Sequence, residues 1–320
     1  MTAREVGERL RSMAEGRVAF DQALGVLTTY RVGGPASVLF EPASPEDLTL
    51  LTTASREAGV DPATLDVVVI GRGSNVVISD QGFDGVVIRM TQPMSWIRSD
   101  DPERVAAGAA TSLPLLANWA ARRSLAGLEF TVGIPGSVGG GVRMNAGAHE
   151  GSISDTLVEV QIFDLHAGVL EQRPAEALGL SYRHSDLGPS EVVVAATFGL
   201  RPDDQEAIKE RMDRYRKHRA DTQPGALQNA GSTFKNPPGD SAGRLVEAAG
   251  LKGHRVGGAA VSELHANFFL ASDSASAQDV FDLVHDVRAR VMERFGIALE
   301  PEVRFIGPFA DSVDRAGAPR

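Results

Sequence analysis

The spacing of apolar residues predicts several helices, the clearest of them over 275–295. Its apolar positions recur every three or four residues, as on one face of a helix, and Gly296 stands where such a helix ends. The apolar stripe consists of Val280, Val284, Val287, Val291 and Phe295. Another helix is expected to begin after Ser44, a capping residue followed by Pro45 and two acidic residues, and to end at Gly59.

Four more segments have helical patterns that differ in polarity. The first twenty residues predict a short amphipathic helix that is loosely attached, and 112–123 predicts a further helix. Charged residues are dense over 203–218, so we expect a solvated helix there that bridges two domains. A helix over 244–249 is expected to have Asp240 as its cap.

Short runs of apolar residues between these helices predict strands. They lie at 67–70, 76–78, 157–163, 192–200 and 302–306. At 320 residues the chain is longer than most single cores, so we expect two domains with a boundary near residue 202. The expected parts are an N-terminal extension 1–24, a first domain 25–202, a smaller domain 203–308 and a tail 309–320.

Glycine is concentrated in two stretches that are too poor in side chains to fill a core. Six glycines and one proline lie within 133–147, and the shorter sequence GRGSN occupies 71–75. We expect backbone N–H groups there to approach an anionic group closely, most often a phosphate, in conformations that only glycine adopts without strain. Two separate phosphate sites indicate a dinucleotide.

The common phosphate-binding motifs do not account for these stretches. Strand, loop and strand are expected around 71–75, whereas the dinucleotide fingerprint needs GxGxxG and a helix after the glycines. Neither stretch ends in the Gly-Lys-Ser/Thr of a Walker loop. We therefore expect loop amides between strands, rather than a helix end, to hold the phosphates.

The composition narrows the possible functions. A formal net charge of −10, without a basic tract, argues against a nucleic-acid binder. The chain has no cysteine, which excludes disulfides, iron–sulfur clusters and a thiolate nucleophile. The N-terminus lacks the apolar core of a signal peptide, and no run of about 18 apolar residues exists. We expect a cytoplasmic protein that does not bind membranes.

Four polar motifs could carry chemistry. They are YRHS at 182–185, GSTFKNP at 231–237, VSELHANF at 261–268 and LEPEVR at 299–304. Taken singly, each is compatible with an ordinary turn or a solvated surface. His184 and His265 have no partner at metal-ligand spacing, so no metal site is expected. Ser232 lacks a GxSxG elbow, which argues against a hydrolase nucleophile.

Together and in this order, the motifs resemble one family, the UDP-N-acetylenolpyruvoylglucosamine reductases, flavoenzymes of peptidoglycan precursor synthesis. The resemblance begins with TTYRVGGPA at 28–36 and continues through GRGSN at 71–75. It includes GLEFTVGIPGSVGGGVRMNAGA at 127–148 and ends with LEPEVRFIG at 299–307. The YRHS motif is similar to the shorter type of this enzyme, which lacks a loop and a tyrosine that close over the substrate.

The resemblance implies an α+β fold and a set of ligands. The fold would be an FAD-binding domain of the vanillyl-alcohol-oxidase type in two subdomains, followed by a smaller C-terminal α+β domain for the substrate. The cofactor would be FAD, with NADPH as hydride donor and a UDP-sugar enolpyruvyl ether as substrate. We expect a monomer.

The resemblance also assigns residues to these ligands. Those expected at the cofactor are Arg31, Gly71, Gly73, Ser74, Asn75, Gly133, Ile134, Pro135, Gly136, Gly139, Gly140, Asn145, Ala146 and Gly147. The candidates for the substrate and NADPH are Tyr182, Lys235, Asn236, Arg244, Lys252, Glu263 and Asn267.

Three residues match the family's catalytic groups. Hydride transfer to the enol ether leaves negative charge on the neighbouring carbon and its carboxylate. Arg183 would pair with this carboxylate in two-point geometry, and Glu302 would polarise it or orient Arg183. Ser232 would donate the proton.

Two other functions remain open from the residues alone. One is an oxidase of alcohols or sugars on the same fold, although such enzymes often tether flavin through His or Cys, and neither glycine stretch contains one. The other is a nucleotide-binding regulatory module without turnover, which would leave the order of Arg183, Ser232 and Glu302 unexplained.

Overall fold

The computed structural model describes residues 2–149, 151–225 and 228–310. The chain divides into two compact units, each assembled from separate stretches of sequence. Unit 1 comprises Met1–Gln22, Ser37–Arg72 and Asp84–Arg219, and unit 2 comprises Ala23–Ala36, Gly73–Phe83 and Ala220–Arg320. The boundary expected near residue 202 differs from this division, in which the last stretch of unit 2 begins at residue 220.

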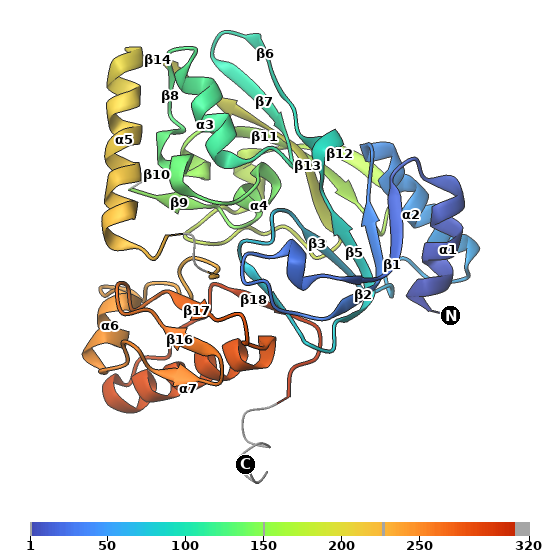
Figure 1. Ribbon diagram of the computed structural model, residues 1–320. Helices are drawn as coiled ribbons and strands as arrows, with labels where there is room; N and C mark the ends of the chain where they lie inside the picture. The colour runs from blue at the N-terminus through green and yellow to red at the C-terminus, as the bar shows by residue number, and fades with distance from the viewer. Residues whose placement is uncertain (1, 150, 226–227, 311–320) are drawn as a thin grey trace. The chain divides into compact units, whose positions relative to one another are not determined.

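The N-terminal segment is integrated into the first sheet. The sheet has the order β1-β2-β5-β3, with strands β1 (Arg17–Ala23), β2 (Pro35–Glu41), β5 (Phe83–Arg89) and β3 (Val67–Ile70). Figure 1 shows α1 (Ala3–Met13) and α2 (Pro45–Glu57) beside it. Val6 and Leu10 of α1 are fully buried in the same apolar cluster as Phe40 of β2. The expected loose attachment is therefore wrong, while the helix start after Ser44 is confirmed.

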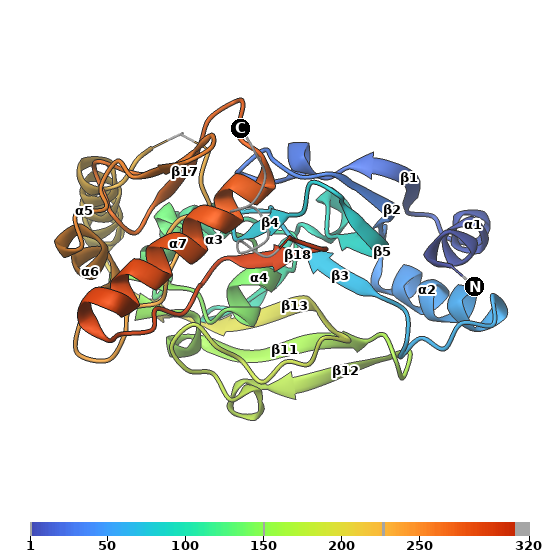
Figure 2. The ribbon, with the colours of Figure 1, turned by 90° about the horizontal axis from the view of Figure 1, so that it is seen from below.

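The second sheet of unit 1 is antiparallel and has the order β12-β11-β13-β7-β6. Its strands are β6 (Ile97–Asp101), β7 (Arg104–Gly108), β11 (Leu157–Asp164), β12 (Val169–Pro174) and β13 (Glu191–Gly199). Figure 2 shows β13, β11 and β12 side by side. The helices α3 (Leu113–Ala121) and α4 (Val138–Arg143) contribute Leu116 and Val142 to the apolar core over this sheet. The strands expected at 157–163 and 192–200 are confirmed.

Helix α5 (Gln205–Thr222) lies in unit 1 up to Arg219, and its last three residues belong to unit 2. Its Ile208 and Met212 are buried in a cluster with Ala117 of α3. The guanidinium of Arg211 donates to Glu129 at 2.7 Å. The helix is confirmed and it connects the two units, but the expectation that it is solvated all round is wrong, because one face of the helix is an apolar contact surface.

Unit 2 is built around α7 (Ala277–Phe295). The four valines of the predicted stripe are fully buried, Ser276 caps the helix, and Gly296 ends it with φ +67°. The other elements are α6 (Ala242–Ala248), β15 (Arg255–Val256), β16 (Ala259–Val261), β17 (Phe269–Ala271), and the parallel pair β4 (Val76–Ile78) and β18 (Arg304–Ile306). The cap of α6 is Ser241, whose hydroxyl accepts from Arg244 N, so the assignment of Asp240 as cap is wrong.

Short elements complete the chain. They are the strands β8 (Leu125–Ala126), β9 (Gly147–Ala148), β10 (Gly151–Ser152) and β14 (Arg201–Pro202), and the 3-10 turns η1 (Gly25–Leu27), η2 (Gln92–Met94), η3 (Glu129–Gly133), η4 (Ile153–Asp155) and η5 (Ala175–Leu178). Most of the expected tail, 311–320, lies outside the described residues. Of the helices formed by the described residues, none has the length and apolar character needed to cross a membrane.

Candidate active site

The GSN part of the 71–75 loop is fixed within unit 2. Gly73 has φ +64°, and a Cβ there would lie 2.3 Å from the carbonyl oxygen of Leu27. Its own carbonyl accepts from Thr29 N at 3.0 Å. On the other side, Asn75 donates from Nδ2 to the carbonyl of Glu302 at 3.0 Å. Glycine is therefore required at position 73 both by the backbone angle and by the close approach.

Ser232 and Glu302 lie on neighbouring backbone segments of unit 2. The amide of Thr233 donates to Asn267 O at 2.8 Å, and the carbonyl of Thr233 accepts from Glu302 N at 2.8 Å. Ser232 itself forms a β-bridge with Phe268. Its hydroxyl is half-buried and has no hydrogen-bond partner among the described residues. The two predicted catalytic residues are thus brought together by main-chain pairing, and within the described ranges no group accepts the hydroxyl proton of Ser232.

Asn267 holds the Ser232 segment in place. Its side chain is only 3% exposed, and it accepts from Phe234 N at 2.9 Å and donates to Phe234 O at 2.8 Å. Both ends of the amide are therefore used on one backbone unit. Asn267 therefore positions the segment that carries Ser232, and its role toward substrate stays a prediction.

Replacing Asn267 by alanine is expected to lower the free energy of unfolding by about 2–4 kcal/mol, because it leaves a buried N–H and a buried C=O unpaired. Urea unfolding monitored by circular dichroism measures the change. Asn118→Ala is the control, since its amide also makes two hydrogen bonds, donating to Pro114 O and accepting from Arg216 Nη2, but at a more exposed place. Equal losses in the two variants would show that pairing with the buried Phe234 backbone adds nothing beyond the loss of two amide hydrogen bonds.

The side chains of four other substrate candidates of unit 2 have partners in the protein, and Glu263 is exposed. Lys235 pairs with Glu300 at 2.6 Å and Lys252 with Glu247 at 2.8 Å. The remaining three candidates are Arg244, Asn236 and Glu263. Arg244 pairs with Asp240, Asn236 accepts from Ala242 N at 3.0 Å, and a Cβ at Gly253 would meet the carboxylate of Glu263. The hydrogen bond from Arg244 lowers the pKa of Asp240 to about 2. Their roles toward substrate stay predictions.

In unit 1, glycines of the 133–147 stretch allow neighbouring residues to approach the main chain closely, and they do not have unusual backbone angles. None of the six, all of them described, has a positive φ, so that expectation is wrong. Instead, a Cβ at Gly133 would lie 2.2 Å from Cδ of Arg219, and one at Gly139 would lie 3.0 Å from Cβ of Ala109. Part of the stretch is also helical, since α4 includes Gly139 and Gly140.

The loop that carries Tyr182 and Arg183 is hydrogen-bonded to the end of this glycine stretch. Arg183 donates from Nη2 to Gly147 O at 2.6 Å, and Asn145 donates from Nδ2 to Ser181 O at 2.9 Å. Arg183 and Asn145 have φ of +54° and +38°, which non-glycine residues rarely adopt. Tyr182 is exposed, with the Arg183 guanidinium 5.1 Å from its ring centre.

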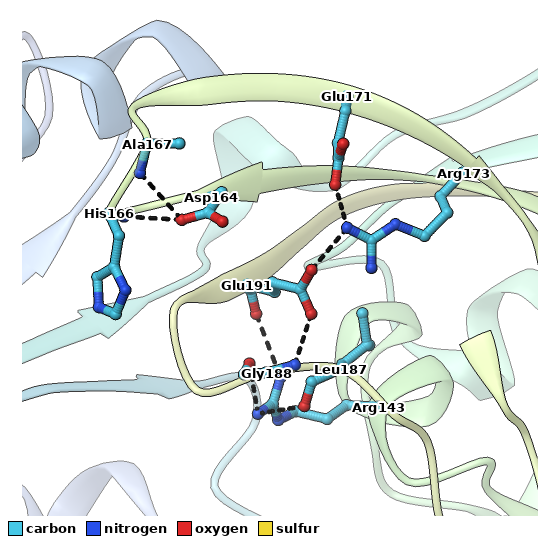
Figure 3. Close-up of polar contacts among 9 residues, drawn as sticks. All are labelled: Arg143, Asp164, His166, Ala167, Glu171, Arg173, Leu187, Gly188 and Glu191. Atoms are coloured by element: carbon cyan, nitrogen blue, oxygen red, sulfur yellow. Dashed lines mark hydrogen bonds and ion pairs between the residues drawn. The ribbon is translucent and has the colours of Figure 1, made fainter. Parts of the chain in front are cut away.

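Arg143, at the end of α4, fixes the far end of the same loop. Figure 3 shows its guanidinium directed at main-chain carbonyls, with Nη2 3.0 Å from Gly188 O and Nη1 3.2 Å from Glu191 O. The Glu191 carboxylate in turn pairs with Arg173 at 2.6 Å, and this contact is the main cause of the raised pKa of Arg173. Helix α4 and the residues just after it therefore hold both ends of the loop that carries Arg183.

Both glycine stretches fit a bound anionic cofactor. Among the described residues, the N–H groups of Gly73, Ser74 and Asn75 donate to no protein acceptor, and the same holds for Gly136 and Gly140. Unpaired amides of this kind are what a pyrophosphate requires. By contrast, no group of three metal-ligating side chains occurs within 2–149, 151–225 and 228–310.

Comparison with known proteins first defines the class. Residues 36–171 match the model of the FAD-binding domain, which together with the unpaired amides makes the chain an FAD-dependent oxidoreductase. Residues 223–306 match the C-terminal domain of UDP-N-acetylenolpyruvoylglucosamine reductase.

Whole-chain similarity defines the family. UDP-N-acetylenolpyruvoylglucosamine reductase 2 of Symbiobacterium thermophilum is 44% identical over 306 residues, which are 94% of this chain and 97% of the relative. The reductase of Rubrobacter xylanophilus is 43% identical over 290 residues, 90% and 95% of the two chains. The crystal structure of the reductase from Thermus caldophilus matches with a TM-score of 0.76 and 36% identity, over 92% of this chain and 99% of that one. The chain belongs to the UDP-N-acetylenolpyruvoylglucosamine reductase family.

These findings confirm the expected family and the α+β fold, with an FAD-binding domain followed by a separate C-terminal domain. The shorter type of the enzyme and the individual site residues stay predictions. Sequence reasoning missed Arg143 and Arg219. Arg143 lies inside the glycine stretch itself, two residues after Gly141, whereas the contact of Arg219 with Gly133 joins distant segments and leaves no local signal.

Proposed function

We propose that the protein reduces UDP-N-acetylglucosamine enolpyruvate to UDP-N-acetylmuramate in peptidoglycan precursor synthesis, with NADPH as hydride donor. FAD, when bound, takes up the hydride and supplies it to the terminal carbon of the substrate's double bond. Besides family membership, one observation supports the proposal: the hydroxyl of Ser232, which has no hydrogen-bond partner in the described residues, lies on a segment hydrogen-bonded to Glu302.

The charge that hydride addition creates determines what the side chains must do. We propose that Ser232 gives its proton to the carbon next to the carboxylate, which forms the second new C–H bond, and regains a proton from water. A serine hydroxyl is a weak acid, but a carbanion is a strong base, so placement matters more than a tuned pKa. Arg183 pairs with the substrate carboxylate, and Glu302 polarises the same group.

The two glycine stretches would hold the cofactor. We propose that the N–H groups of Gly73, Ser74 and Asn75 bind the FAD pyrophosphate and that 133–147 lines the rest of the cofactor. The domain over 203–308 would bind the sugar nucleotide, with Lys235 among its contacts, and Tyr182, which precedes this domain, is a further candidate contact.

The colour of the purified protein tests this function directly. We expect a yellow protein whose absorbance near the flavin band bleaches on adding NADPH without oxygen and returns on adding the enolpyruvyl substrate. Oxygen consumption with an alcohol or sugar and without NADPH would instead identify an oxidase.

Replacing Glu302 by glutamine is expected to slow substrate reduction by about 10- to 1,000-fold, because the group that polarises the carboxylate loses its acid–base character. Flavin reduction by NADPH should be unchanged in stopped-flow measurements. Glu293→Gln is the matched control, since Glu293 is an exposed glutamate of α7 in the same unit. Normal turnover in Glu302→Gln would remove this residue from the mechanism.

We further propose a cytoplasmic monomer that does not bind membranes. We also propose that it does not bind nucleic acid, as the net charge of −10 favours. Light scattering after size-exclusion chromatography tests the monomer, for which the expected mass is 33.9 kDa.

A further inference from the structure

Arg219, in the last turn of α5, lies against the glycine stretch of unit 1. An added Cβ at Gly133 would come within 2.2 Å of Cδ and 2.7 Å of Nε of Arg219. The side chain therefore runs along the main chain of Gly133 instead of extending into solvent. Any larger residue at 133 would displace it.

The guanidinium of Arg219 has no hydrogen bond or ion pair to any residue that the structure describes. The other arginines of α5 that lie near carboxylates are paired: Arg211 with Glu129 and Asp203, and Arg216 with Asp213. Burial alone, with no carboxylate opposing it, lowers the pKa of Arg219. A partly buried cation without a counter-charge costs free energy, which a bound anion would offset.

Uncharged rings, and no paired carboxylate among the described residues, lie near Arg219. The ring of His149 stacks on Tyr215 at 4.2 Å and meets the edge of His218 at 5.5 Å. Burial, together with His218 and Arg219, lowers the pKa of His149. His149 also has φ +52°, a backbone conformation that non-glycine residues rarely adopt.

A role in stabilising the helix does not explain this placement. A cation in the last turn of a helix interacts favourably with the helix dipole, and an exposed arginine does so equally well. The contact with Gly133 instead places the charge at the stretch whose amides at Gly136 and Gly140 are unpaired among the described residues.

We propose that Arg219 is an anion-binding residue that contacts a phosphoryl group of a bound nucleotide. This inference rests on the proposed function, which supplies three such nucleotides: FAD, NADPH and the UDP-sugar. The contact with Gly133 favours FAD, since Gly133 belongs to the stretch assigned to that cofactor.

The test compares Arg219→Ala and Arg219→Lys with Arg214→Ala, an exposed arginine on the same helix. The dissociation constant of FAD is measured by fluorescence titration of the apoprotein, and the KM values of NADPH and the enolpyruvyl substrate at saturating FAD. We expect Arg219→Ala to weaken FAD binding by about 10- to 100-fold, as for loss of a hydrogen bond to a charged group, with a smaller effect in Arg219→Lys.

Each outcome has one meaning. A rise confined to the KM of NADPH or of the substrate assigns the phosphoryl group to that nucleotide and supports the site. The proposal is overturned if all three constants of Arg219→Ala equal those of Arg214→Ala. It is also overturned if the dissociation constant of FAD and both KM values rise in parallel and the melting temperature falls, because this indicates a role in folding. Failure of the proposed function shows separately, as wild-type protein that binds FAD but does not reduce the substrate.

Discussion

Ser232→Ala is expected to reduce the enolpyruvyl substrate about 10²–10⁴ times more slowly than the wild type. Reduction of the flavin by NADPH should stay nearly intact, because that half-reaction needs no proton at the substrate carbon. Stopped-flow absorbance of the flavin follows the two half-reactions separately, and this separation makes the prediction specific.

The structure indicates that the substitution itself is mild. The hydroxyl of Ser232 makes no hydrogen bond to the described residues, and the backbone at 232–235 is held by main-chain pairing and by Asn267. Ser274→Ala, at a serine of unit 2 whose hydroxyl contacts Ser272, controls for removal of a hydroxyl. Equal slowing of both half-reactions in Ser232→Ala would point to binding or folding and would contradict proton donation.

Gly73→Ala is expected to lose most of its FAD and about 2–5 kcal/mol of unfolding free energy. At φ +64° an alanine is strained, and its Cβ would also come within 2.3 Å of Leu27 O and 2.8 Å of Thr28 Cα. Both are backbone atoms, so relief requires the loop to move, and with it the N–H groups of Ser74 and Asn75. Flavin absorbance per protein and urea unfolding of the apoprotein measure the two effects.

Gly239→Ala is the control that separates the cost of a positive φ from the cost of a steric clash of the added Cβ. Gly239 has φ +77° and no atom within 4 Å of the added Cβ, so the substitution should cost only about 1 kcal/mol and leave FAD content unchanged. If Gly73→Ala lost no more stability than Gly239→Ala and retained its flavin, the loop would not be held by the contact with Leu27.

The sequence predicted helices and strands well where the buried residues of an element recur at its structural period. The valines of α7 fall on one face because the helix buries a single stripe. Helix α5 was predicted to be solvated because its two buried residues, Ile208 and Met212, are surrounded in sequence by charged residues. Some of these charges pair with distant residues, as Arg211 does with Glu129. The boundary near 202 could not be placed, since unit 2 takes 23–36 and 73–83 from the N-terminal half and pairs β4 with β18.

The motifs identified the family and named Arg183, Ser232 and Glu302, but not what holds them. The pairing of Thr233 with Glu302 is a long-range main-chain contact that no local pattern shows. The glycines of 133–147 were expected to have unusual angles, whereas neighbours such as Arg219 simply leave no space for a side chain. Within and beside this stretch, positive φ angles occur instead at residues that are not glycine, among them Asn145 and Arg183.

The backbone angle of +54° at Arg183 is a local cost that the same side chain offsets. A left-handed arginine costs the fold on the order of 1 kcal/mol, and its hydrogen bond from Nη2 to Gly147 O contributes a similar or larger amount. Glycine at this position would remove the strain and the hydrogen bond together. Selection for heat resistance alone therefore gains little at position 183, and strain and anchoring are inherited there as one unit.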